Sequence, residues 1–586
     1  MESPESKIVG TNSVLFKVWS PLTNQVDVVG EFNNWHGNQS VLTNIGYGYW
    51  ESVINNIRKN EIYKSIIHQH NGEMNPTGDK ILRDKIKPDT ENSTIHAIEY
   101  KDFEWSPFTT PEFDNLIIYQ FHVGSFSGRN DGLERENRKA TFMDTICKLD
   151  YVKSMGFNAI ALLPVQTFSD DRSLDYNPTF YFTPESTYGE PVELKQLVDE
   201  CHKRGLAVIF DVVYNFITNN DNSFLSFNDA TISSYLSSFE TPWGLNLAFW
   251  QDGIKDFFLS VLSMCFGEYN ADGIRFDATS YLEYNKGLGN DGWEFMQYLT
   301  YFTKMYYPAK YLISEHVPST DSITYSPGLH VARYKSSYEC ILNAMQGYNP
   351  AENMKNSIGL SFGCSNSYTN SWNLFKYMPC SQDESKDMDN RINGHRYYID
   401  LLGGRDNYLA RSKARIIWAL NISLIGTPML FMGNECNMSG YWLDSEDANG
   451  DHRFDWFIAE DEKSIAMRKL VAAANTLRSK HPALQNGFLE ITHKDSTNNI
   501  LAFKRWNSQG DIILTVLNLS DMNFTNHSYA LNINQSGHWQ QILCSQDAEF
   551  GGWDGAGNAF YDPGTNSIDQ ININIPQWSV LMFKLL

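Results

Sequence analysis

The sequence predicts an α/β protein whose central part is a (β/α)8 TIM barrel, with an all-β domain on either side. Three observations support this prediction. Short alternating apolar runs fill the first part of the chain, strand-like runs alternate with helix-like segments through the middle, and alternation without helices returns near the end. We expect an N-terminal β-sandwich over residues 1–105, the barrel over 106–482 and a C-terminal β-sandwich over 483–586.

The N-terminal β-sandwich is predicted from short strand-like runs separated by turn residues, namely VLFKVW, QVDVVGEF and EIYKSII. A polar stretch at about 75–92 follows, and we expect it to be a linking loop. Trp35, Tyr49 and Trp50 lie between these runs. Such aromatic residues either stack on a ligand or fill the core of a small β-sandwich, and the sequence leaves both alternatives open.

The barrel is predicted from eight strand-like runs with helix-like segments between them. The runs are LIIYQFHV, AIALLPV, AVIFDVV, GIRF, YLIS, a weaker one at 330–334, LFKYM and PMLFM. The first three are followed by expected helices over 141–155, 192–204 and 254–266. Eight such units fit a closed barrel better than an open sheet. Because no glycine-rich phosphate loop follows the first run, the sequence also disfavours a dinucleotide-binding fold.

The C-terminal β-sandwich is predicted because the helical period disappears after about Ala483. Alternating runs then return in ILAFKRW, IILTVLNL and the closing WSVLMFKLL. We expect this second β-domain to pack on one end of the barrel.

The composition narrows the class of ligand. A formal net charge of −23 argues against nucleic acid and anionic membranes, which require basic surfaces. Aromatic residues make up 14% of the chain, and their flat rings suit neutral ligands. The eight cysteines show no CxxC pair or metal-binding spacing, so we expect reduced thiols, a cytoplasmic protein, and neither metal nor cofactor. The N-terminal segment lacks the pattern of an export signal, and no long apolar stretch predicts a membrane span.

Four of the predicted strands end in a carboxylate: Asp211, Asp277, Glu315 and Asp383 follow the third, fourth, fifth and seventh runs. The C-terminal ends of barrel strands meet at one mouth, which is where barrel enzymes place their chemistry. The sequence therefore predicts that these four acids converge on a single site.

Two carboxylates about 5 Å apart can carry out a double displacement at an acetal carbon, one attacking while the other transfers the proton. Arg275 lies two residues before Asp277, on the same side of the strand, so we expect it to keep Asp277 ionised. A buried structural ion pair is the alternative interpretation. Glu315 has no cation beside it in sequence, so burial should raise its pKa and suit it to be the acid. Asp383 would accept hydrogen bonds from the sugar hydroxyls in the transition state.

These residues lie in motifs that resemble the α-amylase superfamily of retaining α-glucan enzymes and, within it, the glycogen branching enzymes. In order, the motifs are VVGEFNNW, FHVGSF, ALLPVQTF, DYNPTFYFTPESTYGEPVELKQLVDECHKRG, DVVYN, ADGIRFDA, SEH, SQDES and FMGNE. The resemblance covers nearly the whole chain. It implies an N-terminal glucan-binding module. It also implies that Asp277 is the nucleophile, that Glu315 is the acid/base and that Asp383 stabilises the transition state. Arg275 would be the partner of the nucleophile, Tyr176 the platform under the sugar, and Asp211 a structural ligand of the same site.

The chain departs from the family pattern at two positions. Where the family has histidines that hydrogen-bond the reacting sugar, this sequence has Phe216 and Gln382. Loss of one such donor can cost on the order of a hundredfold in rate. Gln382 can still donate a hydrogen bond, whereas Phe216 cannot. His122, at the end of the first run, is expected at the same mouth, either in contact with the substrate or as a packed, satisfied histidine.

Three functions follow from this resemblance. The first is a 1,4-α-glucan branching enzyme, which acts on glycogen, starch or maltooligosaccharides and which FMGNE and SQDES favour. The second is an α-glucan hydrolase of the amylase or maltooligosyl trehalose hydrolase type, with water as the acceptor. The third, suggested by Phe216 and Gln382, is a glucan-binding protein with impaired catalysis.

Overall fold

The computed structural model describes most of the 586-residue chain. The described residues are 7–58, 61–69, 74–77, 93–94, 103–132, 139–168, 175–217, 235–283, 291–316, 322–333, 335–361, 377–378, 395–442, 453–553, 555–557 and 570–586. Within them, no helix is both long enough and apolar enough to cross a membrane.

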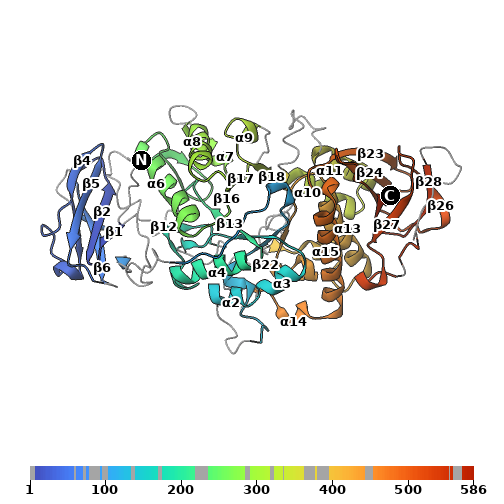
Figure 1. The fold of residues 1–586 in the computed structure, drawn as a ribbon, viewed down its shortest axis with the longest axis horizontal. Coiled ribbons are helices and arrows are strands. Elements are labelled where there is room, and N and C mark those ends of the chain that lie inside the picture. Colours follow the sequence, from blue (N-terminus) through green and yellow to red (C-terminus); the bar gives the residue numbers. More distant parts are fainter. Residues whose placement is uncertain are drawn as a thin grey trace.

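The centre of the molecule is one sheet of eight parallel strands (Figure 1). In chain order these are β9 (Ile118–Phe121), β10 (Ala159–Leu162), β13 (Ala207–Val212), β16 (Gly273–Phe276), β17 (Tyr311–Ser314), β18 (Val331–Arg333), β19 (Tyr377–Met378) and β21 (Met429–Phe431). Each strand pairs with the next, from β9 to β19, and the eighth strand, β21, returns to pair with β9. This is the strand order of a (β/α)8 barrel, so the predicted fold class and all eight predicted strands are confirmed.

The inner strands are continuous apolar runs because both faces of the sheet are covered. Every residue of β9, β10, β13, β16 and β17 is buried. Parallel sheets with helices outside and packed side chains inside require this pattern. Polar residues are therefore conspicuous in these strands. Arg275 and Asp211 occupy paired positions of β16 and β13, so the register places the two side by side.

Helices cover the outside of the barrel sheet. They are α1 (Val123–Phe126), α2 (Phe142–Ile146), α3 (Leu149–Ser154), α4 (Pro191–Lys203), α6 (Asp252–Ser263), α7 (Ser280–Glu283), α8 (Asp291–Tyr306), α9 (Ser322–Tyr325), α10 (Lys335–Met345), α11 (Pro350–Ser361), α12 (Tyr398–Leu401), α13 (Tyr408–Ser423), α14 (Trp456–Ala459), α15 (Glu462–Lys480) and α16 (Pro482–Asn486). α4 begins with Pro191 after a capping box of Glu190 and Glu193, both favourable at a helix start. The helix expected over 141–155 is instead two short helices, α2 and α3, separated at Cys147 and Lys148.

The N-terminal β-domain consists of two antiparallel sheets, β1-β2-β5-β4 and β3-β6-β7, with β8 paired to β6. Their strands are β1 (Lys7–Gly10), β2 (Ser13–Trp19), β3 (Thr23–Gly30), β4 (Thr43–Gly46), β5 (Tyr49–Asn55), β6 (Ile62–Gln69), β7 (Met74–Thr77) and β8 (Ser93–Thr94). The loop expected at 75–92 therefore begins as a strand. Most of it lies outside the described residues.

The N-terminal domain packs against the barrel through its aromatic residues. The Trp19 ring lies 5.0 Å from Tyr235, and a Cβ placed on Gly253 would come within 2.1 Å of the Trp19 ring. Tyr49 Oη donates to Asp256 of α6 over 2.8 Å. Trp50 is buried, whereas Trp35 is 42% exposed. Of the three aromatic residues singled out in the sequence, Tyr49 and Trp50 therefore serve packing and docking.

The C-terminal β-domain has a five-stranded sheet of order β23-β24-β25-β29-β27 and a two-stranded sheet, β26-β28. The strands are β23 (Phe488–Asp495), β24 (Ile500–Trp506), β25 (Ile512–Asn518), β26 (Phe524–Asn532), β27 (Trp539–Cys544), β28 (Gln570–Ile575) and β29 (Ser579–Leu585). Strand β29 packs against α13, so this domain covers one side of the barrel, as expected (Figure 1).

Candidate active site

Arg275 is the centre of a buried charge cluster at the C-terminal ends of the barrel strands. Its Nη1 lies 2.5 Å from Asp211 Oδ2 at the end of β13, and its Nη2 lies 2.6 Å from Glu315 Oε2 after β17. Asp277 Oδ1 is 3.6 Å from Nη1. Tyr176 Oη donates to Asp211 Oδ2 over 2.7 Å and accepts from Arg275 Nη1 over 3.3 Å. One guanidinium thus holds three of the four predicted strand-end carboxylates together.

Burial controls the ionisation of this cluster. Burial raises the pKa of Asp211 to about 6, although Arg275 and the Tyr176 hydroxyl oppose the shift. The pKa of Asp277 lies well above its usual range, first because the carboxyl is buried and second because Glu315 is negatively charged, while Arg275 opposes both effects. Burial also raises the pKa of Tyr176, so its hydroxyl remains a donor. These effects favour the protonated form of Asp277 more than in an exposed aspartate.

The ionisation of Asp277 differs from the sequence-based expectation. We expected Arg275 to keep its chain neighbour Asp277 ionised and Glu315 to have no cation. Instead, the guanidinium reaches sideways, and its two shortest contacts go to acids on the adjacent strands. The remaining support for Asp277 is weaker, because Asn215 Nδ2 lies 3.4 Å from Asp277 Oδ2. Sequence analysis did not connect Asn215 with Asp277, because only the register of β13 against β16 brings the two together.

His122 lies in a polar network of its own. Its Nδ1 is 2.8 Å from Ser125 Oγ, and its Nε2 is 2.9 Å from both Asp175 Oδ2 and Tyr188 Oη. Asp175 has a φ of 67°, which is uncommon outside glycine and is stabilised here by these bonds. Asp175 directly precedes Tyr176, so His122 helps to position the chain segment that carries the Tyr176 platform.

Phe216 packs against the ring of Trp243, beside the charge cluster around Arg275. Its ring is 2% exposed and 5.7 Å from that of Trp243, which in turn lies 5.1 Å edge-on from Tyr281 of α7. Trp243 is 51% exposed. The ring of Phe216 therefore supports Trp243, and it supplies no hydrogen bond to a sugar. Sequence analysis missed Trp243 and Tyr281, because nothing in their spacing connects them to the strand ends.

A tight hairpin holds Trp243 in this position. The hairpin consists of β14 (Leu236–Glu240) and β15 (Leu245–Leu247), and Leu245 forms a bridge to Ile217. A Cβ on Gly244 would lie 2.0 Å from the Ile217 carbonyl oxygen, so only glycine fits between the hairpin and the segment after β13. The hairpin thus fixes the tryptophan next to the residues that follow Asp211 and Asn215.

Two of the predicted site residues, Gln382 and Asp383, lie outside the described residues. Their convergence with Asp277 and Glu315 stays a prediction.

The fold and the cluster define an enzyme of the glycoside hydrolase and glycosyltransferase class, built on a (β/α)8 barrel. Three segments of the chain match domain models of α-amylase family proteins. The chain matches the profile of the alpha amylase catalytic domain over residues 136–258, that of the alpha amylase C-terminal all-beta domain over 491–585, and that of carbohydrate-binding module 48 (isoamylase N-terminal domain) over 3–88.

Relatives in sequence span almost the whole chain. The 1,4-alpha-glucan branching enzyme GlgB of Marinobacter nauticus is 25% identical, covering 93% of this chain and 88% of its own length. GlgB of Halothermothrix orenii is 26% identical over 98% of this chain and 94% of its own.

Solved structures share the fold. A putative alpha amylase from Salmonella typhimurium superposes over 100% of both chains with a TM-score of 0.75 and 16% identity. An Anoxybacillus pullulanase, solved with maltotetraose, has a TM-score of 0.77 at 15% identity, covering 99% of this chain and 87% of its own.

Proposed function

We propose that this protein is a 1,4-α-glucan branching enzyme. It would cleave an α-1,4 linkage of glycogen, starch or a maltooligosaccharide and transfer the released chain to a 6-hydroxyl group of another glucan. The observation that carries the chemistry is the contact of one guanidinium, Arg275, with three carboxylates at one barrel mouth. The choice of branching over other α-glucan reactions is supported by the relatives that bear this name over nearly their full lengths.

The first half of the reaction breaks the glucan. Asp277 attacks the anomeric carbon and forms a covalent glucosyl ester, while Glu315 gives its proton to the departing glycosidic oxygen. Arg275 and the positive charge that develops at the anomeric carbon in the transition state both favour the ionised form of Asp277. Asp383 would stabilise the flattened ring of the transition state.

The second half of the reaction makes the branch. Glu315 takes the proton of an acceptor 6-hydroxyl, the oxygen attacks the anomeric carbon, and the bond to Asp277 breaks. Tyr176 forms the platform beneath the sugar, with its hydroxyl held by Asp211 and Arg275. With Phe216 in place of a polar donor, Gln382 and the exposed Trp243 would provide the remaining contacts with the sugar.

The proposal is tested by incubating the protein with amylose and following iodine colour, reducing ends and the proton NMR signal of α-1,6 linkages. Loss of colour with few new reducing ends and a growing α-1,6 signal is the expected result. Reducing ends that rise in step with colour loss would identify a hydrolase. Binding to glycogen with no change in amylose would identify a glucan-binding protein without turnover. The Asp277→Asn variant is the control, because it must lose whichever activity is seen.

A further inference from the structure

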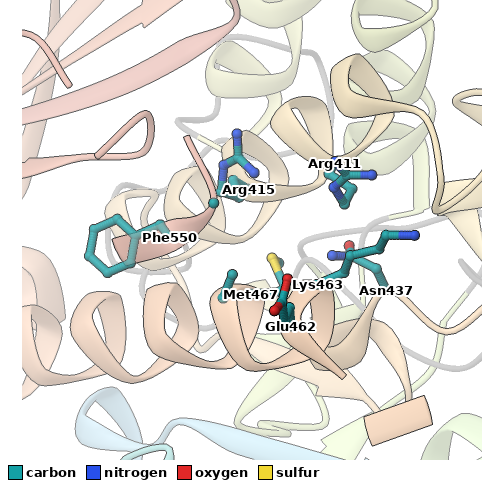
Figure 2. A pocket seen from close by; sticks show the side chains of 9 residues that line it. Arg411, Arg415, Asn437, Glu462, Lys463, Met467 and Phe550 are labelled. Carbon is teal, nitrogen blue, oxygen red and sulfur yellow. The ribbon is translucent and has the colours of Figure 1, made fainter. Parts of the chain in front are cut away.

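A second polar cavity lies between two barrel helices and the C-terminal domain. Its volume is about 170 Å³. The lining side chains come from α13 (Arg411 and Arg415), from α15 (Lys463 and Met467), from the segment after β21 (Asn437) and from Phe550. Figure 2 shows the two arginines on one side of the cavity, with Lys463 and Met467 opposite. The cavity shares no residue with the cluster around Arg275.

Arg415 is buried in this cavity, and among the described residues no carboxylate forms an ion pair with it. Its side chain is 2% exposed, and its Nη2 donates to Ser412 Oγ at 2.9 Å and to Gln546 Oε1 at 3.0 Å, both neutral acceptors. Its Nε has no hydrogen-bond partner. Burial lowers the pKa of Arg415 to about 10, as expected when no carboxylate compensates the charge. Burying a cation in this way is unfavourable unless an anion joins it.

The neighbouring charges do not compensate Arg415. Arg411 is half-buried, and its Nη1 donates to the backbone oxygen of Arg405 over 2.7 Å. Burial lowers the pKa of Arg411, although Asp406 and Asp461 oppose the shift. Asp406 pairs with Lys463, which itself lines the cavity, and Asp461 pairs with Arg405. Glu462, on the exposed rim, is the one acid that lines the cavity within the described residues.

Two further features of the cavity bear on the kind of ligand. The buried Asn437 lines the cavity, and its Oδ1 atom has no hydrogen-bond partner. Arg411 and Lys463 belong to the first turns of α13 and α15, helices of 16 and 19 residues. The positive ends of both helix dipoles therefore meet at the cavity.

Other deeply buried arginines in this chain show that the arrangement is unusual. Arg478 donates to four backbone carbonyl oxygens, and Arg505 to three. Those carbonyls replace an anion. Arg415 has no such set of carbonyl oxygens within the described residues, and its side chain lines the cavity.

We propose that this cavity binds a phosphate group, either as free phosphate or as part of a small phosphorylated metabolite. The oxygens of the phosphate would accept from the guanidinium groups of Arg411 and Arg415 and from the Asn437 amide. Arg–phosphate contacts of this kind are charge-assisted and directional. The apolar side chains of Met467 and Phe550 leave room for an organic portion beside the phosphate.

The proposal is tested by calorimetric titration of the full chain with inorganic phosphate and, separately, with glucose 6-phosphate, at constant ionic strength. Chloride and unphosphorylated glucose are the controls. Saturable binding of either phosphate compound is expected. If both bind, the phosphate group suffices. If only glucose 6-phosphate binds, the ligand is a phosphorylated metabolite, and if only inorganic phosphate binds, it is the free ion.

Arg411→Gln should weaken binding about tenfold or more, since it removes a charge-assisted contact without disturbing the core. Lys469→Gln is the control. It removes an exposed charge from α15, the other helix beside the cavity, and should leave the affinity unchanged. Absence of saturable binding to both probes would overturn the proposal. The proposal would also be overturned if wild-type protein and Arg411→Gln bound the probe with equal affinity, or if both variants lost the same amount of affinity. Displacement of phosphate by equimolar chloride would overturn it as well.

Discussion

Arg275 and Arg415 are both almost completely buried, yet their surroundings are opposite. Three carboxylates lie within 4 Å of the Arg275 guanidinium, whereas the hydrogen-bond partners of Arg415 are neutral. The barrel mouth therefore has an excess of negative charge, which suits a neutral sugar that becomes positive in the transition state. The cavity between α13 and α15 has an excess of positive charge, which suits an anion. Both arginines are buried, so the sign of the uncompensated charge around each one determines which kind of ligand its site suits.

The largest expected effect is on catalysis at the negative site. Asp277→Asn preserves the shape of the side chain but cannot form the glucosyl ester, so turnover of amylose should fall about 10⁴-fold or more. The iodine assay measures this loss, and retention of glycogen binding shows that the protein is still folded. Activity within tenfold of wild type would remove Asp277 from the nucleophile role.

The two arginines should respond in opposite directions to the same substitution. Arg275→Met leaves three buried carboxylates without their cation and should cost about 3–5 kcal/mol of unfolding free energy. Arg415→Met removes an unpaired buried charge, and Gln546 Oε1 keeps its hydrogen bond from Tyr408. Without phosphate, this variant should be as stable as wild type or more stable by about 1 kcal/mol. Urea unfolding at pH 7 gives both values. Similar losses in the two variants would refute the contrast.

The raised pKa of Asp277 gives the negative site a characteristic pH dependence. A carboxyl whose folded-state pKa is raised contributes stability at low pH that is lost as the pH rises through the folded value. Asp277→Asn removes this loss. The variant should therefore gain thermal stability relative to wild type as the pH rises above about 4, the usual pKa of an unfolded aspartate, and unfolding temperatures measured between about pH 4 and pH 8 follow this gain. A difference that shrinks as the pH rises would mean that Arg275 keeps Asp277 ionised after all.

The smallest expected effect is at the rim of the barrel mouth. Trp243→Ala removes the exposed ring above Phe216 and should raise KM for maltoheptaose about two- to tenfold with little change in kcat. Phe457→Ala is the matched control, because Phe457 is 77% exposed on α14 and takes no part in the cluster. Equal KM values for Trp243→Ala and wild type would exclude Trp243 from sugar binding.

Much of the fold could be predicted because buried parallel strands have a simple signature. AIAL, AVIFDV and GIRF are fully buried and, apart from Asp211 and Arg275, apolar, and Asp277 directly follows GIRF at the mouth. The strands missed by sequence analysis were polar or half-exposed. In β26, FTNHSYALN, only Tyr529 and Leu531 are buried, so its alternation is too weak to recognise.

The site was predictable only in part. The sequence identified the acids because each lies at or near the C-terminal end of a predicted strand, but it assigned Arg275 to its chain neighbour. Side-chain partners across a sheet depend on register, and the register of β13, β16 and β17 directs this guanidinium to Asp211 and Glu315. The Arg415 cavity had no sequence signal at all, because α13, α15 and Phe550 come together only in the packed protein. The domain boundaries at 105 and 482 stay predictions.

The most direct test of the central claim is to trap the glucosyl-enzyme. Glu315→Gln lacks the acid/base, yet α-maltotriosyl fluoride needs little protonation to leave, so the ester should form and persist. Mass spectrometry of the digested protein should then find one maltotriosyl group on the peptide that contains Asp277, and none in the Asp277→Asn/Glu315→Gln double variant. Attachment to any other residue, or fluoride release without an adduct on Asp277, would contradict the account.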